Sequence, residues 1–188
     1  MKMTKNQQWI LQDKETKRII ELYGLLDCEQ EELATYEKLS TPDHKPTKAQ
    51  QKKIDEWKLE QQKQTKLSKL QKVYTHKDNW IITIKDDEGN KLTNDINWLK
   101  NNLAKTIFFF SDEGKPIAKS LTIDEVENIK SNFVFLGFSR LEAKNKIQTK
   151  IKNAINNKEL EEIDIVFDLK KEFTLEELKI QISVEKKA

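Results

Sequence analysis

The chain has 188 residues, of which 35% are charged and 36% hydrophobic, against about 25% and roughly 45–50% in ordinary globular domains. Lys and Arg total 34 and Asp and Glu total 32, so the net charge is near zero although the charge density is high. Complete disorder is excluded by apolar blocks such as 107–110, which would be costly to leave in water. The length allows one ordinary domain, or a compact domain with a helical extension.

The composition also excludes several function classes. No apolar run approaches the ~20 residues of a membrane span, and the first eight residues lack the apolar core of a signal peptide, which predicts a cytoplasmic protein. One cysteine, Cys28, permits no internal disulfide. The four glycines are too scattered for a phosphate-binding loop. Because His44 and His76 lie far apart without a ligand motif, we expect no zinc site and no cofactor.

Residues 1–77 are predicted to form an almost wholly helical region. Thr4 with Gln7 resembles a capping box, and the amphipathic stretch that follows is predicted to end at Gly24. A second helix is predicted over 27–39, followed by a loop over the two prolines.

Thr47 and Gln50 predict the start of a long third helix, which reaches about Tyr74. Its apolar positions form a heptad seam interrupted by two glutamines. These positions are Ile54, Trp57, Leu67, Leu70 and Tyr74. The seam is explained by pairing with a second copy of the chain or by packing on the body of the protein. We favour self-association or packing against another protein, so a homo-oligomer stays open.

Residues 78–188 are predicted to form a small α+β domain with a short antiparallel sheet and one long helix. Short β-branched or aromatic runs bounded by turn residues predict strands over 79–85, 106–111 and 116–120. A short helix is predicted over 93–105.

The clearest local signal is the capping box of Thr122 and Glu125, which predicts a long helix to about residue 154. A second capping box, Thr174 with Glu177, predicts another helix start. Further strands are predicted over 164–167 and 180–184. The fold class is therefore α+β, with an N-terminal helical region before a small mixed domain.

A run of lysines without acids marks the helix over 61–77. Lys63, Lys66, Lys69 and Lys72 are candidates for neutralising phosphates. Their spacing of three spreads the charges around about half of a helix, and no arginine joins them. A solvated helix surface also explains the run, so nucleic acid is an alternative partner through this tract only.

Aromatic side chains supply the other candidate partner-binding residues. The four tryptophans, Trp9, Trp57, Trp80 and Trp98, are predicted to lie in the core, as large aromatic residues of regular elements usually do. Phe135 and Phe138 lie off the main apolar stripe of their helix and would form a partner-binding patch if exposed. These two, the four lysines and Trp57 make up the predicted binding set.

No catalytic constellation is found in the sequence. Cys28 has no positioned base, and neither histidine has a recognisable Ser or Cys partner. We therefore expect a protein that is not an enzyme.

Residues 120–126, 143–154 and 157–164 combine a capping box, a long helix and an acidic turn. In this order they resemble a small domain family of unassigned biochemical function, common in phage and prophage tail-fibre and tail-assembly proteins. The resemblance covers about residues 109–165. It implies a phage origin and supplies no catalytic residues.

The leading prediction is a non-enzymatic phage or prophage protein that binds another protein, as a tail-associated accessory or assembly factor. The first alternative is an anti-CRISPR-type inhibitor that occludes an RNA-guided nuclease of the host. The second is a nucleic-acid-binding protein that uses the lysine-rich helix 61–77. A partner that is a phage structural component or a host defence effector implies the host cytoplasm or the virion.

Overall fold

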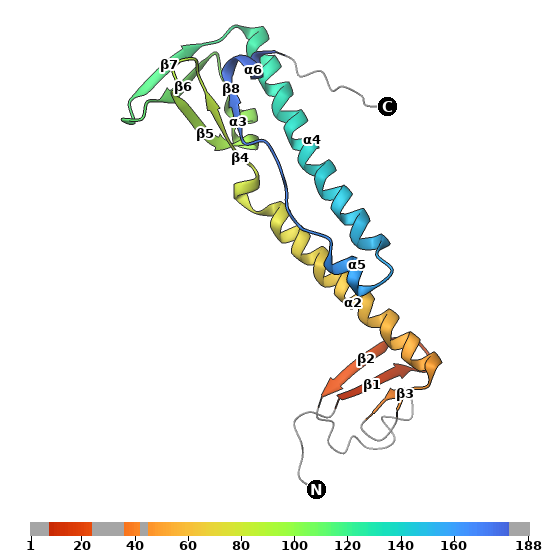
Figure 1. Cartoon of the computed structure of the whole chain (residues 1–188). Coiled ribbons are helices and arrows are strands. Elements are labelled where there is room, and N and C mark those ends of the chain that lie inside the picture. Colours follow the sequence, from red (N-terminus) through yellow and green to blue (C-terminus); the bar gives the residue numbers. More distant parts are fainter. Residues whose placement is uncertain (1–7, 24–35, 42–44, 181–188) are drawn as a thin grey trace. The chain divides into compact units, whose positions relative to one another are not determined.

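The structure is a computed structural model that describes residues 8–23, 36–41 and 45–180. The chain has an α+β fold with two sheets (Figure 1). It divides into two compact units: unit 1 comprises residues 1–65 with 155–157, and unit 2 comprises 66–154 with 158–188. Helix α2 (Lys48–Thr75) contributes residues to both units.

Unit 1 contains a three-stranded antiparallel sheet of order β2-β1-β3. Its strands are β1 (Gln8–Asp13), β2 (Ile19–Tyr23) and β3 (Tyr36–Ser40). The core of the unit joins Ile10 and Leu39 of the sheet to Ile54 of α2.

The predicted N-terminal helical region is wrong, because the chain begins with strands and the long helix follows a sheet. The Asp13 carboxylate accepts hydrogen bonds from the N–H groups of Glu15 at 2.9 Å and Thr16 at 2.7 Å. Lys17 has φ of 60°, in the left-handed region, so the chain reverses there. The two flanking runs, rich in β-branched and aromatic residues, then pair as strands.

The second predicted helix is also wrong within the part of the chain that the structure describes, since residues 36–40 form β3. The predicted cap at Thr4, the predicted helix end at Gly24 and the stretch 27–35 lie outside the described residues.

The predicted start of the long helix is confirmed. The Thr47 N–H donates to Gln50 Oε1 at 2.9 Å, and the Gln50 N–H donates to Thr47 Oγ1 at 3.3 Å. The buried apolar residues Ile54 and Leu70 lie on either side of a stretch in which Gln61 and Gln64 are exposed. The apolar seam is therefore interrupted, as the sequence indicates.

Unit 2 contains a five-stranded sheet of order β7-β6-β5-β4-β8, in which only the β4–β8 pair is parallel. Its strands are β4 (Ile81–Lys85), β5 (Lys91–Asp95), β6 (Thr106–Phe110), β7 (Pro116–Ser120) and β8 (Glu172–Thr174). Strands β4, β6 and β7 confirm the three strands predicted in this part of the sequence. The helix predicted over 93–105 is shorter, because residues 91–95 pair with β4 and the Asp95 side chain caps α3 (Ile96–Asn102).

The remaining helices are η1 (Lys77–Asn79), α4 (Ile123–Asn153), α5 (Asn157–Glu161) and α6 (Leu175–Lys179). Both predicted capping boxes, at Thr122 and Thr174, are confirmed. Helices α3, α4 and α6 pack on one face of the sheet (Figure 1), where Phe109, Ile129 and Leu178 join one core. Phe108 and Phe110, which alternate with the buried residues of β6, are about half exposed.

The strand predicted over 164–167 is wrong. These residues have no strand pairing, and β8 forms further along the chain, where Phe173 is buried beside Ile84. Of the strand predicted over 180–184, only Ile180 lies within the described residues.

A buried carboxylate organises the β4–β5 turn. Asp86 accepts hydrogen bonds from the Asn90 N–H at 2.8 Å, Asn90 Nδ2 at 2.9 Å and the Glu88 N–H at 3.0 Å, and Lys119 Nζ lies 3.4 Å away. Burial raises the pKa of Asp86, but the hydrogen bonds outweigh it and hold the pKa below its ordinary value.

A lowered carboxylate pKa contributes stability that is present above the unfolded-state value and is lost as the pH falls through the folded-state value. We therefore expect the urea midpoint of the wild type to fall below about pH 4. The fall is expected to be shallower in Asp86→Asn than in the control Asp87→Asn, whose side chain is exposed in the same turn. Equal slopes in the two variants would show that Asp86 does not control acid stability.

Candidate functional site

A groove of about 310 Å³ opens in unit 2 between β5 and β6, beside α3. Apolar residues of the core side, such as Leu99 and Ile107, line its floor, while Trp98, Phe108 and Phe110 line its rim. We call this site the aromatic groove. None of its lining residues carries a charge.

The three rim side chains are about half exposed: 51% for Trp98, 53% for Phe108 and 47% for Phe110. The two phenylalanines are exposed because side chains alternate along β6. Ile107 and Phe109 are buried against the helices, so their neighbours must lie on the uncovered face.

The groove exists because β5 and β6 diverge. Strand β4 pairs with β5 through five residue pairs, and β6 pairs with β7 through five. Between β5 and β6 the register contains one pair, Lys91 with Phe110. From that pair onward the two strands separate, and the lining residues of α3 lie at the opening.

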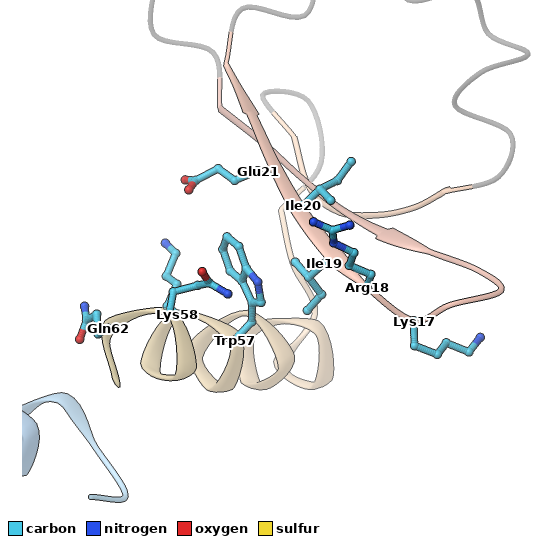
Figure 2. A pocket seen from close by; sticks show the side chains of 9 residues that line it. Lys17, Arg18, Ile19, Ile20, Glu21, Trp57, Lys58 and Gln62 are labelled. Carbon is cyan, nitrogen blue, oxygen red and sulfur yellow. The ribbon is translucent and has the colours of Figure 1, made fainter. Parts of the chain in front are cut away.

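A second groove, of about 990 Å³, lies in unit 1 between β2 and α2. Figure 2 shows Trp57 projecting from α2 with its ring beside Ile19. The charged residues that line it are Lys17, Arg18, Glu21 and Lys58. This groove, which we call the Trp57 groove, is open and has a mixed polar and apolar lining.

The four candidate lysines do not share one environment. Lys66 Nζ donates to the Leu160 carbonyl and, at 3.3 Å, to the Glu161 carbonyl. Lys63 also has an interaction partner, whereas Lys69 and Lys72 are exposed. Nucleic-acid binding through this tract stays a prediction.

The aromatic predictions have mixed outcomes. Phe138 is 62% exposed and Phe135 is half-buried, so α4 carries an exposed apolar position where the sequence suggested one. Trp9, Trp57 and Trp80 are half-buried. The prediction that Trp98 lies in the core is wrong, because it follows the cap of a short helix at the edge of the groove.

Sequence reasoning missed the aromatic groove. The available signal was the unbroken apolar run over 107–110, because a strand covered on one face needs apolar residues at alternate positions only. The surplus phenylalanines of such a run lie on the open face.

Metal-ligating and histidine side chains form no further candidate site among the described residues. No three His, Cys, Asp or Glu side chains in the described ranges are arranged to hold a metal ion. His76 is exposed, with its Nδ1 3.5 Å from Asp78 Oδ2, and Cys28 and His44 lie outside those ranges. In the same ranges, no helix combines the length and the apolar character needed to cross a membrane.

No protein-family model, curated protein or solved structure shows a significant match to the chain. The resemblance of residues 109–165 to a phage tail-fibre domain therefore stays a prediction.

Proposed function

We propose that the chain is a non-enzymatic protein that binds another protein through the aromatic groove of unit 2. The observation that carries this proposal is the set of three half-exposed aromatic side chains around one apolar groove. Single exposed apolar residues are ordinary, but adjacent ones mark interaction surfaces. Aromatic residues seated beside a pocket are also the typical energetic centres of protein interfaces.

The lining chemistry supports binding rather than turnover. General acid–base and nucleophilic catalysis need a titratable or nucleophilic side chain at the reacting atom. The only hydroxyl groups in the groove belong to threonines, Thr93 and Thr106, and its amides belong to Asn94 and Asn102. No described base lines the groove to activate either hydroxyl. These four residues supply neutral hydrogen-bonding groups around an apolar floor.

The uncharged lining of the aromatic groove also indicates the class of partner. An uncharged aromatic site favours apolar protein surface over a phosphate backbone, whose binding depends on cations. The two partner classes that the sequence suggests, a phage structural component and an RNA-guided nuclease of the host, are both proteins. We propose these two classes as the first candidates for direct binding measurements.

The proposal is tested with purified full-length chain and purified candidates of both classes. Phe108→Ser and Phe110→Ser are expected to weaken binding at least about tenfold, which corresponds to about 1.4 kcal/mol. The matched control Phe138→Ser removes an equally large exposed ring from α4 and is expected to leave affinity unchanged. Binding is expected to persist at high salt and after nuclease treatment.

Two results would contradict the proposal. Loss of binding in Phe138→Ser, with binding retained in Phe108→Ser, would place the interface on α4. Binding that falls steeply with salt and requires Lys69 and Lys72 would support the nucleic-acid alternative instead.

A further inference from the structure

We infer that the aromatic groove binds an extended apolar segment of the partner, which adds as a short β-strand between the diverging strands β5 and β6. This inference rests on the proposed function and specifies its partner. It follows from the main-chain geometry of the two strands, their side chains and the charge at the open end of the groove.

The hydrogen bonds of β5 with β4 fix which way its main-chain N–H and C=O groups point. The Ile96 N–H donates to the Trp80 carbonyl at 2.9 Å, and the Asp86 N–H donates to the Asn90 carbonyl at 3.0 Å. Hydrogen-bonded and non-hydrogen-bonded pairs alternate along an antiparallel ladder. The intervening hydrogen-bonded pairs with β4 are therefore 82–94 and 84–92. The N–H and C=O groups of Lys91 and Thr93 consequently point away from β4, toward β6.

The same reasoning applies to β6. The Leu121 N–H donates to the Lys105 carbonyl at 2.6 Å, and the Ser111 N–H donates to the Lys115 carbonyl at 3.0 Å. Residues 107 and 109 therefore form the hydrogen-bonded pairs with β7. The main-chain groups of Phe108 and Phe110 point toward β5.

Two residues of β5, Lys91 and Thr93, thus face two residues of β6, Phe110 and Phe108. The ladder joins only one of these two pairs. Lys91 and Phe110 are in register, but Thr93 and Phe108 have no partner in the β5–β6 register. Both residues line the aromatic groove. At exposed sheet edges, extended peptides bind by strand addition, in which main-chain hydrogen bonds give affinity and side-chain pockets give specificity. Thr93 and Phe108 offer main-chain groups of the same kind inside the sheet, where the register does not join them.

The groove also sets the length and side-chain pattern of its occupant. The diverging stretch spans about three residues on each strand, or roughly 10 Å at about 3.3 Å per residue. An added strand presents alternate side chains to opposite faces. One set would contact the apolar floor at Leu99 and Ile107, and the other would lie against the ring of Phe108 on the uncovered face.

The charge at the open end of the groove favours an acidic occupant. Lys91 lies at the closed end, where its Nζ is 3.4 Å from Asp112 Oδ1. Lys105 directly precedes the lining residue Thr106 at the open end, and it has no ion-pair partner among the described residues. The nearby carboxylate of Asp95 is directed to the N–H groups at the start of α3. The complementary partner is therefore an apolar extended segment with a carboxylate near the Lys105 end.

The experiment selects peptides that bind the full wild-type chain from a library of random 12-residue peptides displayed on beads. Peptides that also bind the Phe108→Ser variant are removed from the selection. Enriched peptides are expected to alternate apolar residues and to carry an acidic residue at one end. N-methylation of the peptide amide that bonds to the groove is expected to weaken binding at least about tenfold, because it removes a main-chain donor. N-methylation at the next residue, whose amide points the other way, serves as the matched control.

The possible failures are distinguishable. Peptides that bind Phe108→Ser as well as the wild type would overturn the proposed function itself. Some peptides could need Phe108 but have apolar residues at helical spacing, or tolerate both N-methylations equally. This result would support the aromatic groove as the binding site and would overturn strand addition. A selection without any groove-dependent peptide would also overturn it. Slowed hydrogen exchange at the Thr93 and Phe108 amides in the peptide complex is the expected supporting result.

Discussion

Replacement of Phe109 by alanine is expected to lower the free energy of unfolding by about 3–5 kcal/mol. Phe109 is fully buried in the core of unit 2, where the sheet meets α3 and α4. Truncation removes the ring from this core and leaves a cavity, and both changes destabilise the folded state. The loss is measured by urea denaturation of the full chain, followed by circular dichroism.

The neighbouring substitution Phe108→Ala is the matched control, because the two residues are identical, adjacent and on opposite faces of β6. Phe108 is 53% exposed, so its truncation is expected to change stability by about 1 kcal/mol or less. The same substitution is expected to weaken partner binding. Equal destabilisation by the two substitutions would contradict the assignment of the faces of this strand.

Truncation of Arg140 is the second large expected effect. The side chain is only 1% exposed in α4, its Nε donates to the Asn79 carbonyl at 2.7 Å and its Nη1 donates to the Leu136 carbonyl at 3.0 Å. Its Nη2 has no hydrogen-bond partner among the described residues. Arg140→Ala leaves a cavity and removes the donor to Asn79, so we expect a loss of about 2–4 kcal/mol.

The charge of Arg140 is itself unfavourable. Burial lowers the pKa of the guanidinium, against the opposing effects of Asp95 and Tyr74. A cation whose pKa is lowered by folding costs stability while it stays charged. Arg140→Met and Arg140→Ala both remove this charge and the donor to Asn79, but methionine refills most of the space, so Arg140→Met is expected to be more stable than Arg140→Ala by at least about 1 kcal/mol. A methionine variant as unstable as the alanine variant in urea denaturation would show that the hydrogen bonds dominate.

The sequence predicts unit 2 better than unit 1, for a physical reason. The capping boxes at Thr122 and Thr174 need only residues three apart, so local sequence is enough to place them. In unit 1, the hairpin depends on a turn in which Lys17 adopts a left-handed conformation. Lysine gives no signal for that conformation, and the apolar residues on both sides of the turn match a helical pattern equally well.

The candidate site is harder to predict than the elements that build it. The alternation of β6 is local, so the exposure of Phe108 and Phe110 could be derived once one face of the sheet is known to be covered. The groove itself depends on the single pair that joins β5 to β6. The register between two strands depends on residues far apart in the sequence. Because α3 separates β5 from β6 along the chain, local sequence patterns do not predict how the two strands pair.

Trp98 illustrates the same limit. A tryptophan on an amphipathic helix is ordinarily part of the core, but α3 has only seven residues, and its buried side is occupied by Ile96 and Leu99. Trp98 therefore lies at the rim of the groove.

The central claim, that a partner protein docks on the aromatic groove, is tested most directly by hydrogen–deuterium exchange of the full chain with and without bound partner. The expected result is increased protection concentrated in residues 91–110, and its loss in Phe108→Ser. Protection confined to α4 around Phe138 or to the Trp57 groove, with no change over residues 91–110, would contradict the claim.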